Sequence, residues 1–290
     1  MRTVVTRSYS QSILVFLLLL CVFSGRTAAA PAAGADGQFS ESRSSHFILY
    51  QDVAIDQRSG WRGSRRFERD VLEALETAFA RVEAWLGLRP LRPVRVVVYD
   101  AEVFDREFAG IFRFAAAGFY HGVIRVRSGT SVDQALVRVL YHEYVHAAFD
   151  ARAASVVLPA WVNEGVAEWI EHRAIGQQRL AAWQRETLAQ AAHAGELPSL
   201  DTLMTANLGY LEGRPAALAY LQAYAFIEHL ARRYGEHSLR QFLELLLRTQ
   251  PFERALRTAF RGDLGRLEAD FRAELHGLAT RPGKKDGLAP

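Results

Sequence analysis

Cysteine is almost absent from this 290-residue sequence, which contains only Cys21. With one cysteine, the chain cannot form an intramolecular disulfide. Cys21 also lies in an apolar N-terminal run that is interpreted below as an export signal. A metal site in the rest of the chain would therefore have to use His, Asp or Glu side chains instead of thiolates.

Long hydrophobic runs and an excess of one charge are lacking as well. No apolar stretch reaches the roughly 18 residues that a membrane-spanning helix needs. The net charge is +3, and Arg2, Arg7 and Arg26, which have no acidic residue near them, account for it. The remaining chain is neutral, which gives no indication of nucleic-acid or anionic-membrane binding. Glycine-rich phosphate loops and serine-nucleophile motifs are also absent.

The first 35 residues have the pattern of a secretory signal. Arg2 and Arg7 precede a short apolar run, 13–23, and small residues follow it. We expect export to the periplasm or beyond, with no membrane span left after signal removal. The candidate cleavage positions follow Ala29, Ala32 and Ala35.

Two alternatives concern the same segment. An uncleaved anchor helix is disfavoured because the apolar run is short. A lipoprotein anchored through Cys21 is disfavoured because Leu20 is larger than the residue that usually precedes a lipid-attachment cysteine.

The rest of the chain predicts an α+β fold, with a small mixed β-sheet subdomain followed by a mostly helical lobe. We predict a linker at 36–44, one catalytic domain at 45–280 that divides near residue 131 (45–131 and 132–280), and a loose tail at 281–290. The expected strands are 46–50, 94–99 and 118–127. The expected helices are 64–86, 132–150, 160–174, 177–194, 215–234, 237–248 and 252–277.

The predicted helix 132–150 carries His142, Glu143 and His146 in the order HExxH. Residues four apart lie on one helix face, so both imidazoles can reach one metal ion. Zinc peptidases use this arrangement, with the glutamate as general base. The flanking residues are strongly apolar, and buried histidines without partners would cost several kcal/mol, so a metal is a better explanation than an ordinary amphipathic helix.

The predicted helix 160–174 provides two acidic residues, Glu164 and Glu168, on an otherwise apolar face. We assign Glu164 as the third metal ligand. Glu168, one turn further, is placed to accept a hydrogen bond from the outer nitrogen of a ligand histidine. The alternative is that both acids form a solvated edge of the helix.

These motifs resemble a known family. HExxH followed by Trp-x-Asn-Glu-Gly-x-Ala at 161–167 is similar to the gluzincins, in particular the bacterial peptidase MA-like group, which shares its core with the membrane alanyl aminopeptidases. The resemblance implies a zincin-like fold, Zn²⁺ as cofactor, Glu164 as ligand and Glu168 behind the first histidine. Its spacing between His146 and Glu164 is one residue shorter than is usual in the aminopeptidases.

A helix further along the chain, 219–235, resembles the one that carries the aminopeptidases' catalytic tyrosine. This alignment implies that Tyr220 stabilises the oxyanion. Tyr224 lies four residues later on the same face and is the alternative donor. Both tyrosines could instead simply pack in the core.

The sequence departs from the aminopeptidases in a segment that affects substrate specificity. The aminopeptidases have an acidic residue just before the zinc helix that binds the substrate's free amine, whereas 117–124 contains none. We therefore predict an exported zinc metallopeptidase, of endopeptidase rather than aminopeptidase type, that acts on peptides or proteins through a zinc-activated water with Glu143 as base. A non-catalytic, zinc-stabilised binding module is the alternative from another class.

Overall fold

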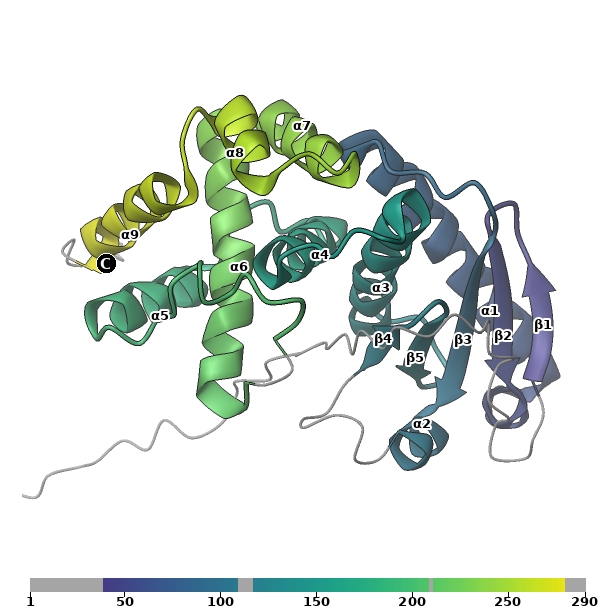
Figure 1. Ribbon diagram of the computed structural model, residues 1–290. Coiled ribbons are helices and arrows are strands. Elements are labelled where there is room, and N and C mark those ends of the chain that lie inside the picture. The colour runs from purple at the N-terminus through teal and green to yellow at the C-terminus, as the bar shows by residue number, and fades with distance from the viewer. Residues whose placement is uncertain (1–38, 109–116, 209–210, 280–290) are drawn as a thin grey trace, which may run out of the picture.

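The computed structural model describes residues 39–108, 117–208 and 211–279 (Figure 1). The predicted signal at 1–35 and tail at 281–290 lie outside these residues. Within the described part of the chain, no helix combines the length and apolar character needed to cross a bilayer.

The first part of the chain forms a five-stranded sheet in the order β1-β2-β3-β5-β4. The central strands β2, β3 and β5 are parallel, and the outer strands β1 and β4 are antiparallel to their neighbours. The predicted small mixed sheet followed by a mostly helical region is therefore confirmed (Figure 1). The strands are β1 (Phe39–Arg43), β2 (Phe47–Asp52), β3 (Val94–Asp100), β4 (Gly118–Tyr120) and β5 (Ile124–Ser128).

Several local features differ from the sequence-based expectation, and one is that the predicted helix 64–86 begins earlier, at Val53. Strand β1 lies inside the predicted linker, because it is a polar edge strand without an apolar pattern. The predicted strand 118–127 is a hairpin, turned at Gly122, whose φ of 68° favours glycine. A short helix, α2 (Ala101–Glu107), was not expected. Asp100 caps it by accepting a hydrogen bond from the Glu102 amide.

The helices α1 (Val53–Leu86) and α3 (Gln134–Ala153) cover one face of the sheet. Alternate strand residues such as Val96, Val98 and Val126 point into this main core. Their neighbours Val97 and Tyr99 point to the opposite face, where a smaller aromatic cluster packs against α2. Helix α3, which carries the HExxH motif, therefore lies on the main-core side of the sheet.

The second part of the chain is helical and packs onto α3 through α4. The expected helix 252–277 is two helices. Arg261 adopts a left-handed conformation (φ 58°), and Asp263 caps the second helix by accepting from the Arg266 amide. The helices are α4 (Ala160–Ala174), α5 (Ala182–His193), α6 (Gly213–Tyr234), α7 (Glu236–Leu247), α8 (Phe252–Phe260) and α9 (Leu264–Ala279).

Gly165 allows α4 and α6 to approach closely. A Cβ atom at this position would lie 2.5 Å from the backbone oxygen of Ala223 and 2.8 Å from the side chain of Ile227. The Ala223 oxygen belongs to the backbone, so it cannot shift without moving the helix. The glycine next to Glu164 therefore sets the distance between the two helices.

Replacing Gly165 with alanine should destabilise the protein by about 1–3 kcal/mol, because the added methyl group forces α4 and α6 apart. Urea unfolding followed by circular dichroism measures this loss. Gly277→Ala is the matched control, since its Cβ would meet nothing within 4 Å. An unchanged free energy of unfolding in Gly165→Ala would contradict the close contact.

Candidate metal centre

Helices α3 and α4 run antiparallel, and their polar side chains pair across the interface. Asp133 caps α3 by accepting a hydrogen bond from the Leu136 amide (2.8 Å). Beyond this cap, Arg138, His142 and His146 follow one another at four-residue spacing on one face. Successively later residues of α3 pair with earlier residues of α4, from Glu171 back to Asn163.

The two histidines and Glu164 bring three potential ligand atoms together. Glu164 Oε2 lies 3.4 Å from His142 Nε2 and 3.8 Å from His146 Nε2. Two atoms bound to one tetrahedral zinc at about 2.0–2.1 Å are roughly 3.3 Å apart. The spacing therefore fits a shared metal ion.

All three side chains are buried, and these three atoms have no hydrogen-bond partner. Buried polar atoms are nearly always satisfied, so three unsatisfied atoms that face one another need an explanation. A bound cation provides one, since it would accept all three lone pairs. The donor set of two imidazoles and one carboxylate is one that zinc accepts in hydrolytic sites.

The outer nitrogen of each histidine is held by α4. His142 Nδ1 donates to Glu171 Oε2 (2.9 Å), and His146 Nδ1 donates to Asn163 Oδ1 (3.1 Å). With the proton on Nδ1, each Nε2 carries a lone pair toward Glu164. The structure thus orients both rings for metal binding.

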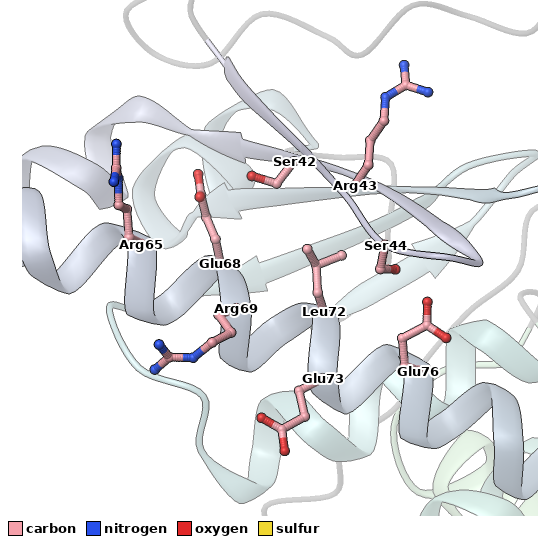
Figure 2. A pocket seen from close by; sticks show the side chains of 9 residues that line it. All are labelled: Ser42, Arg43, Ser44, Arg65, Glu68, Arg69, Leu72, Glu73 and Glu76. Carbon is pink, nitrogen blue, oxygen red and sulfur yellow. The ribbon is translucent and has the colours of Figure 1, made fainter.

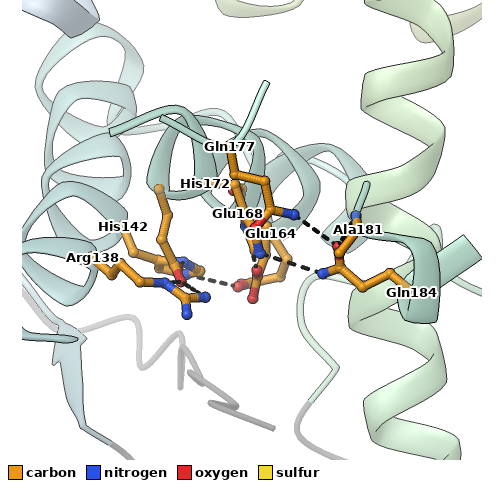
Figure 3. Close-up of polar contacts among 9 residues, drawn as sticks. Arg138, His142, Glu164, Glu168, His172, Gln177, Ala181 and Gln184 are labelled. Carbon is orange, nitrogen blue, oxygen red and sulfur yellow. Dashed lines mark hydrogen bonds and ion pairs between the residues drawn. The ribbon is translucent and has the colours of Figure 1, made fainter. Parts of the chain in front are cut away.

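The residue behind His142 differs from the sequence-based expectation, which was Glu168. Relative to Glu164, Glu171 is seven residues on and returns almost to the same angular position on the helix, whereas Glu168 is rotated further round. Glu171 therefore faces His142. Glu168 is buried instead beside His172, with its Oε2 3.5 Å from His172 Nδ1 (Figure 3).

The charges of these acids are set by their surroundings. Burial acts to raise the pKa of Glu171, but the hydrogen bond from His142 and the charge of Arg138 outweigh it and lower the pKa to about 2. For Glu168, burial and the charge of Glu171 outweigh the opposing charges of His142 and Arg138 and raise the pKa to about 8. Of the two, Glu171 is the acid held in the charged form.

A second group of potential ligands consists of His142, Glu168 and Glu171. Arg138 already contacts this group, with its Nε 2.7 Å from Glu171 Oε1. A guanidinium thus supplies the positive charge there. The group of His142, His146 and Glu164 has no such cation and is the better metal site.

Glu143 lies next to the metal-binding group and is 1% exposed. Neither of its carboxylate oxygens has a hydrogen-bond partner. Burial, followed by the charges of Glu164 and Glu171, raises its pKa to about 8, against the opposing effect of His142. A carboxyl group of this kind is suited to exchange protons with a bound molecule.

Tyr220 and Tyr224 are both buried on α6, which packs against α4. The Tyr224 ring stacks on His172, with ring centroids 4.3 Å apart and planes inclined by 15°. Tyr224 is thus tied to the polar cluster around Glu168.

Sequence reasoning missed three participants: Arg138, Asn163 and Glu171. Each had a detectable signal. Arg138 precedes His142 by one helical turn, Asn163 adjoins Glu164, and Glu171 follows Glu164 by two turns. The spacing shows which residues share a face, but not which atoms meet across two helices.

A separate open pocket of about 530 Å³ lies between β1 and α1 (Figure 2). Side chains of both charge signs line it, including Arg43, Arg65 and Glu68. None of the metal-site residues contributes to its walls. The pocket is therefore distinct from the candidate metal centre.

A mixed sheet, a buried HExxH helix and an acid-bearing second helix are together typical of metallopeptidases. Comparison with protein families agrees, because residues 74–277 match the Peptidase MA superfamily, and this range is more than half of the chain. The chain belongs to the Peptidase MA superfamily. No curated protein matches the sequence.

Proposed function

We propose that this protein is an exported, gluzincin-type zinc endopeptidase. The observation that carries the proposal is the convergence of three buried, unpartnered ligand atoms from His142, His146 and Glu164, beside the unpartnered carboxyl group of Glu143. The superfamily supports a metal-dependent peptidase. Export rests on the signal-like N-terminus alone.

His142, His146 and Glu164 would hold the metal, leaving room for a water molecule. When bound, zinc supplies the Lewis acidity that lowers the pKa of that water. Glu143 accepts the water's proton as the oxygen attacks the peptide carbonyl carbon. The same carboxyl group then passes the proton to the nitrogen of the leaving amine.

Strand β4 offers a place for an extended substrate, since it is the last strand in the sheet order and lies beside α3. A Cβ at Gly118 would be 2.7 Å from the Val139 side chain, so the strand lies tightly against this helix. An extended peptide can add to an edge strand through backbone hydrogen bonds. Such pairing would bring a peptide bond alongside the HExxH turn.

The proposal predicts that N-terminally acetylated peptides are cleaved at least as fast as the same peptides with free amines. The reason is that 117–124 contains no acid to bind an amine. Purified mature protein, incubated with a peptide library in paired blocked and free forms, tests this by mass spectrometry. A chelator-treated sample is the control. Strong preference for free amines would favour an aminopeptidase instead, and absence of chelator-sensitive cleavage would contradict the peptidase function.

The non-catalytic alternative requires a closed structural zinc site. Such sites usually have four protein ligands. Among the described residues, the favoured group provides three, and Glu168 belongs to the other group. A metal with a free coordination position favours catalysis over a purely structural role.

The tyrosines of α6 give a separate prediction. Removing a hydroxyl that stabilises the oxyanion should lower kcat about 10²- to 10³-fold, while zinc content and Tm stay nearly unchanged. We expect this loss in Tyr220→Phe, as the family alignment implies. Tyr224→Phe is the matched comparison, because its ring stacks on His172 and should remain in place. A loss confined to Tyr224→Phe would assign oxyanion stabilisation to Tyr224, one helical turn later. Unchanged kcat in both variants would exclude both tyrosines as the oxyanion donor.

A further inference from the structure

Arg138 contacts the metal centre indirectly, through Glu171. It lies on α3 one turn before His142, and Figure 3 shows both side chains on this helix. The Arg138 Nε donates to Glu171 Oε1 at 2.7 Å, and its Nη2 pairs with the same oxygen. The other carboxylate oxygen, Oε2, accepts the hydrogen bond from His142 Nδ1.

One carboxylate oxygen of Glu171 therefore binds an arginine, and the other binds a metal-ligand histidine. Its side chain is 2% exposed, so water cannot replace either partner readily. A buried carboxylate is tolerated when it is paired and hydrogen-bonded, and arginine's planar fork fixes the orientation of the group it binds. With Oε1 held by Arg138, Oε2 is directed at His142.

We propose that Arg138 is a positioning residue for His142 and acts through Glu171. This inference rests on the proposed zinc site. Partners behind a ligand histidine fix its tautomer and ring orientation, and their loss typically lowers metal affinity about 10- to 100-fold. Arg138 does not touch the metal-binding atoms, so its effect on zinc must pass through the carboxylate.

The two ligand histidines differ in how they are supported. His146 is held by the neutral amide of Asn163, whereas His142 is held by a carboxylate that is itself bound to a cation. The apolar residues of α3 and α4 already pack in the main core. The interhelical ion pair is therefore not the only link between these helices, and Arg138 holds Glu171 in addition to the apolar packing.

A double-mutant cycle tests this inference through the zinc Kd, measured by competition with a chelator of known affinity. We expect Arg138→Met and Glu171→Gln each to weaken zinc binding about 10- to 100-fold. The double variant should bind no more than about twofold more weakly than Glu171→Gln, because residues acting in series are not additive. Arg138→Lys, which keeps the charge but not the fork, should lie between wild type and Arg138→Met.

Two matched controls accompany the cycle. Arg127→Met removes an exposed arginine that pairs with Asp105 and should leave zinc affinity unchanged. Glu168→Gln removes the neighbouring buried acid and should weaken zinc binding less than Glu171→Gln does. ¹⁵N NMR of the His142 ring in the zinc-loaded protein gives a second measurement. We expect the Nδ1 proton, which is hydrogen-bonded to Glu171, to exchange slowly with water in wild type and faster in Arg138→Met.

Wild-type zinc affinity in Arg138→Met would overturn the inference, as would additive losses in the double variant. If Arg138→Met does not fold, Arg138→Lys is used in its place. Wild-type zinc affinity in Arg138→Lys would then overturn the inference. These results are independent of hydrolysis. A wild-type protein that binds zinc but cleaves no peptide refutes the proposed function and leaves this inference standing.

Discussion

Glu143→Gln is expected to bind zinc as tightly as wild type and to hydrolyse peptides about 10²- to 10⁴-fold more slowly. Glutamine has nearly the same shape as glutamate, so the buried side chain should still fit. It cannot take a proton from water, however, and so cannot serve as the base. The unpartnered oxygens and the raised pKa of Glu143 are the structural grounds for this expectation.

The measurement is kcat and KM on the best peptide substrate, with zinc content and Tm recorded for each sample. A fall in kcat with little change in KM indicates loss of an interaction made in the transition state. Glu244→Gln, an exposed substitution on α7, is the control and should have wild-type activity. Wild-type turnover in Glu143→Gln would exclude the proposed mechanism, while zinc binding without any hydrolysis in wild type would favour the non-catalytic module.

The second large effect concerns the metal itself. We expect about one zinc per mature chain, and its loss in His142→Ala, His146→Ala and Glu164→Ala. Each substitution removes one of the three proposed ligands, whose candidate donor atoms lie within 4.8 Å of one another. Two remaining ligands hold zinc far more weakly, so activity should fall together with the metal content.

Elemental analysis after gel filtration measures the stoichiometry. Binding also stabilises the folded state, so added zinc should raise the Tm of wild type but not that of the three variants. His237→Ala replaces an exposed histidine on α7 and should retain zinc and the Tm shift. Full zinc content in all three ligand variants would show that the metal, if any, binds elsewhere.

The sequence predicted much of the fold from local patterns. Apolar residues at helical spacing predicted α4 with its observed bounds, 160–174, and placed α3 within a few residues of Gln134–Ala153. The boundaries failed where local chemistry outweighed the pattern. The polar strand β1 has no apolar alternation, and the break at Arg261 depends on a left-handed backbone that periodicity does not reveal.

For the candidate site, too, local sequence patterns predicted one part and missed another. Four-residue spacing was enough to place His142 and His146 on one face and to propose Glu164 from the next helix, because helix geometry is fixed by the backbone. The predicted roles of Tyr220 and Tyr224 stay predictions, since they depend on how α6 is rotated against α4. Likewise, Glu168 and Glu171 both lie near the face of α4 that carries Glu164. Only the packing of α3 against α4 brings Glu171 to His142.

By itself the sequence determined the kinds of side chain available for chemistry: two imidazoles, carboxylates and no thiolate near them. It also determined which of these share a helix face, since that depends only on positions along one helix. The tertiary structure decided which atoms meet, including the support of His142 by Glu171 and Arg138. The physical reason is that contacts between helices depend on their separation and rotation, which close packing at residues such as Gly165 fixes and which no single helix encodes.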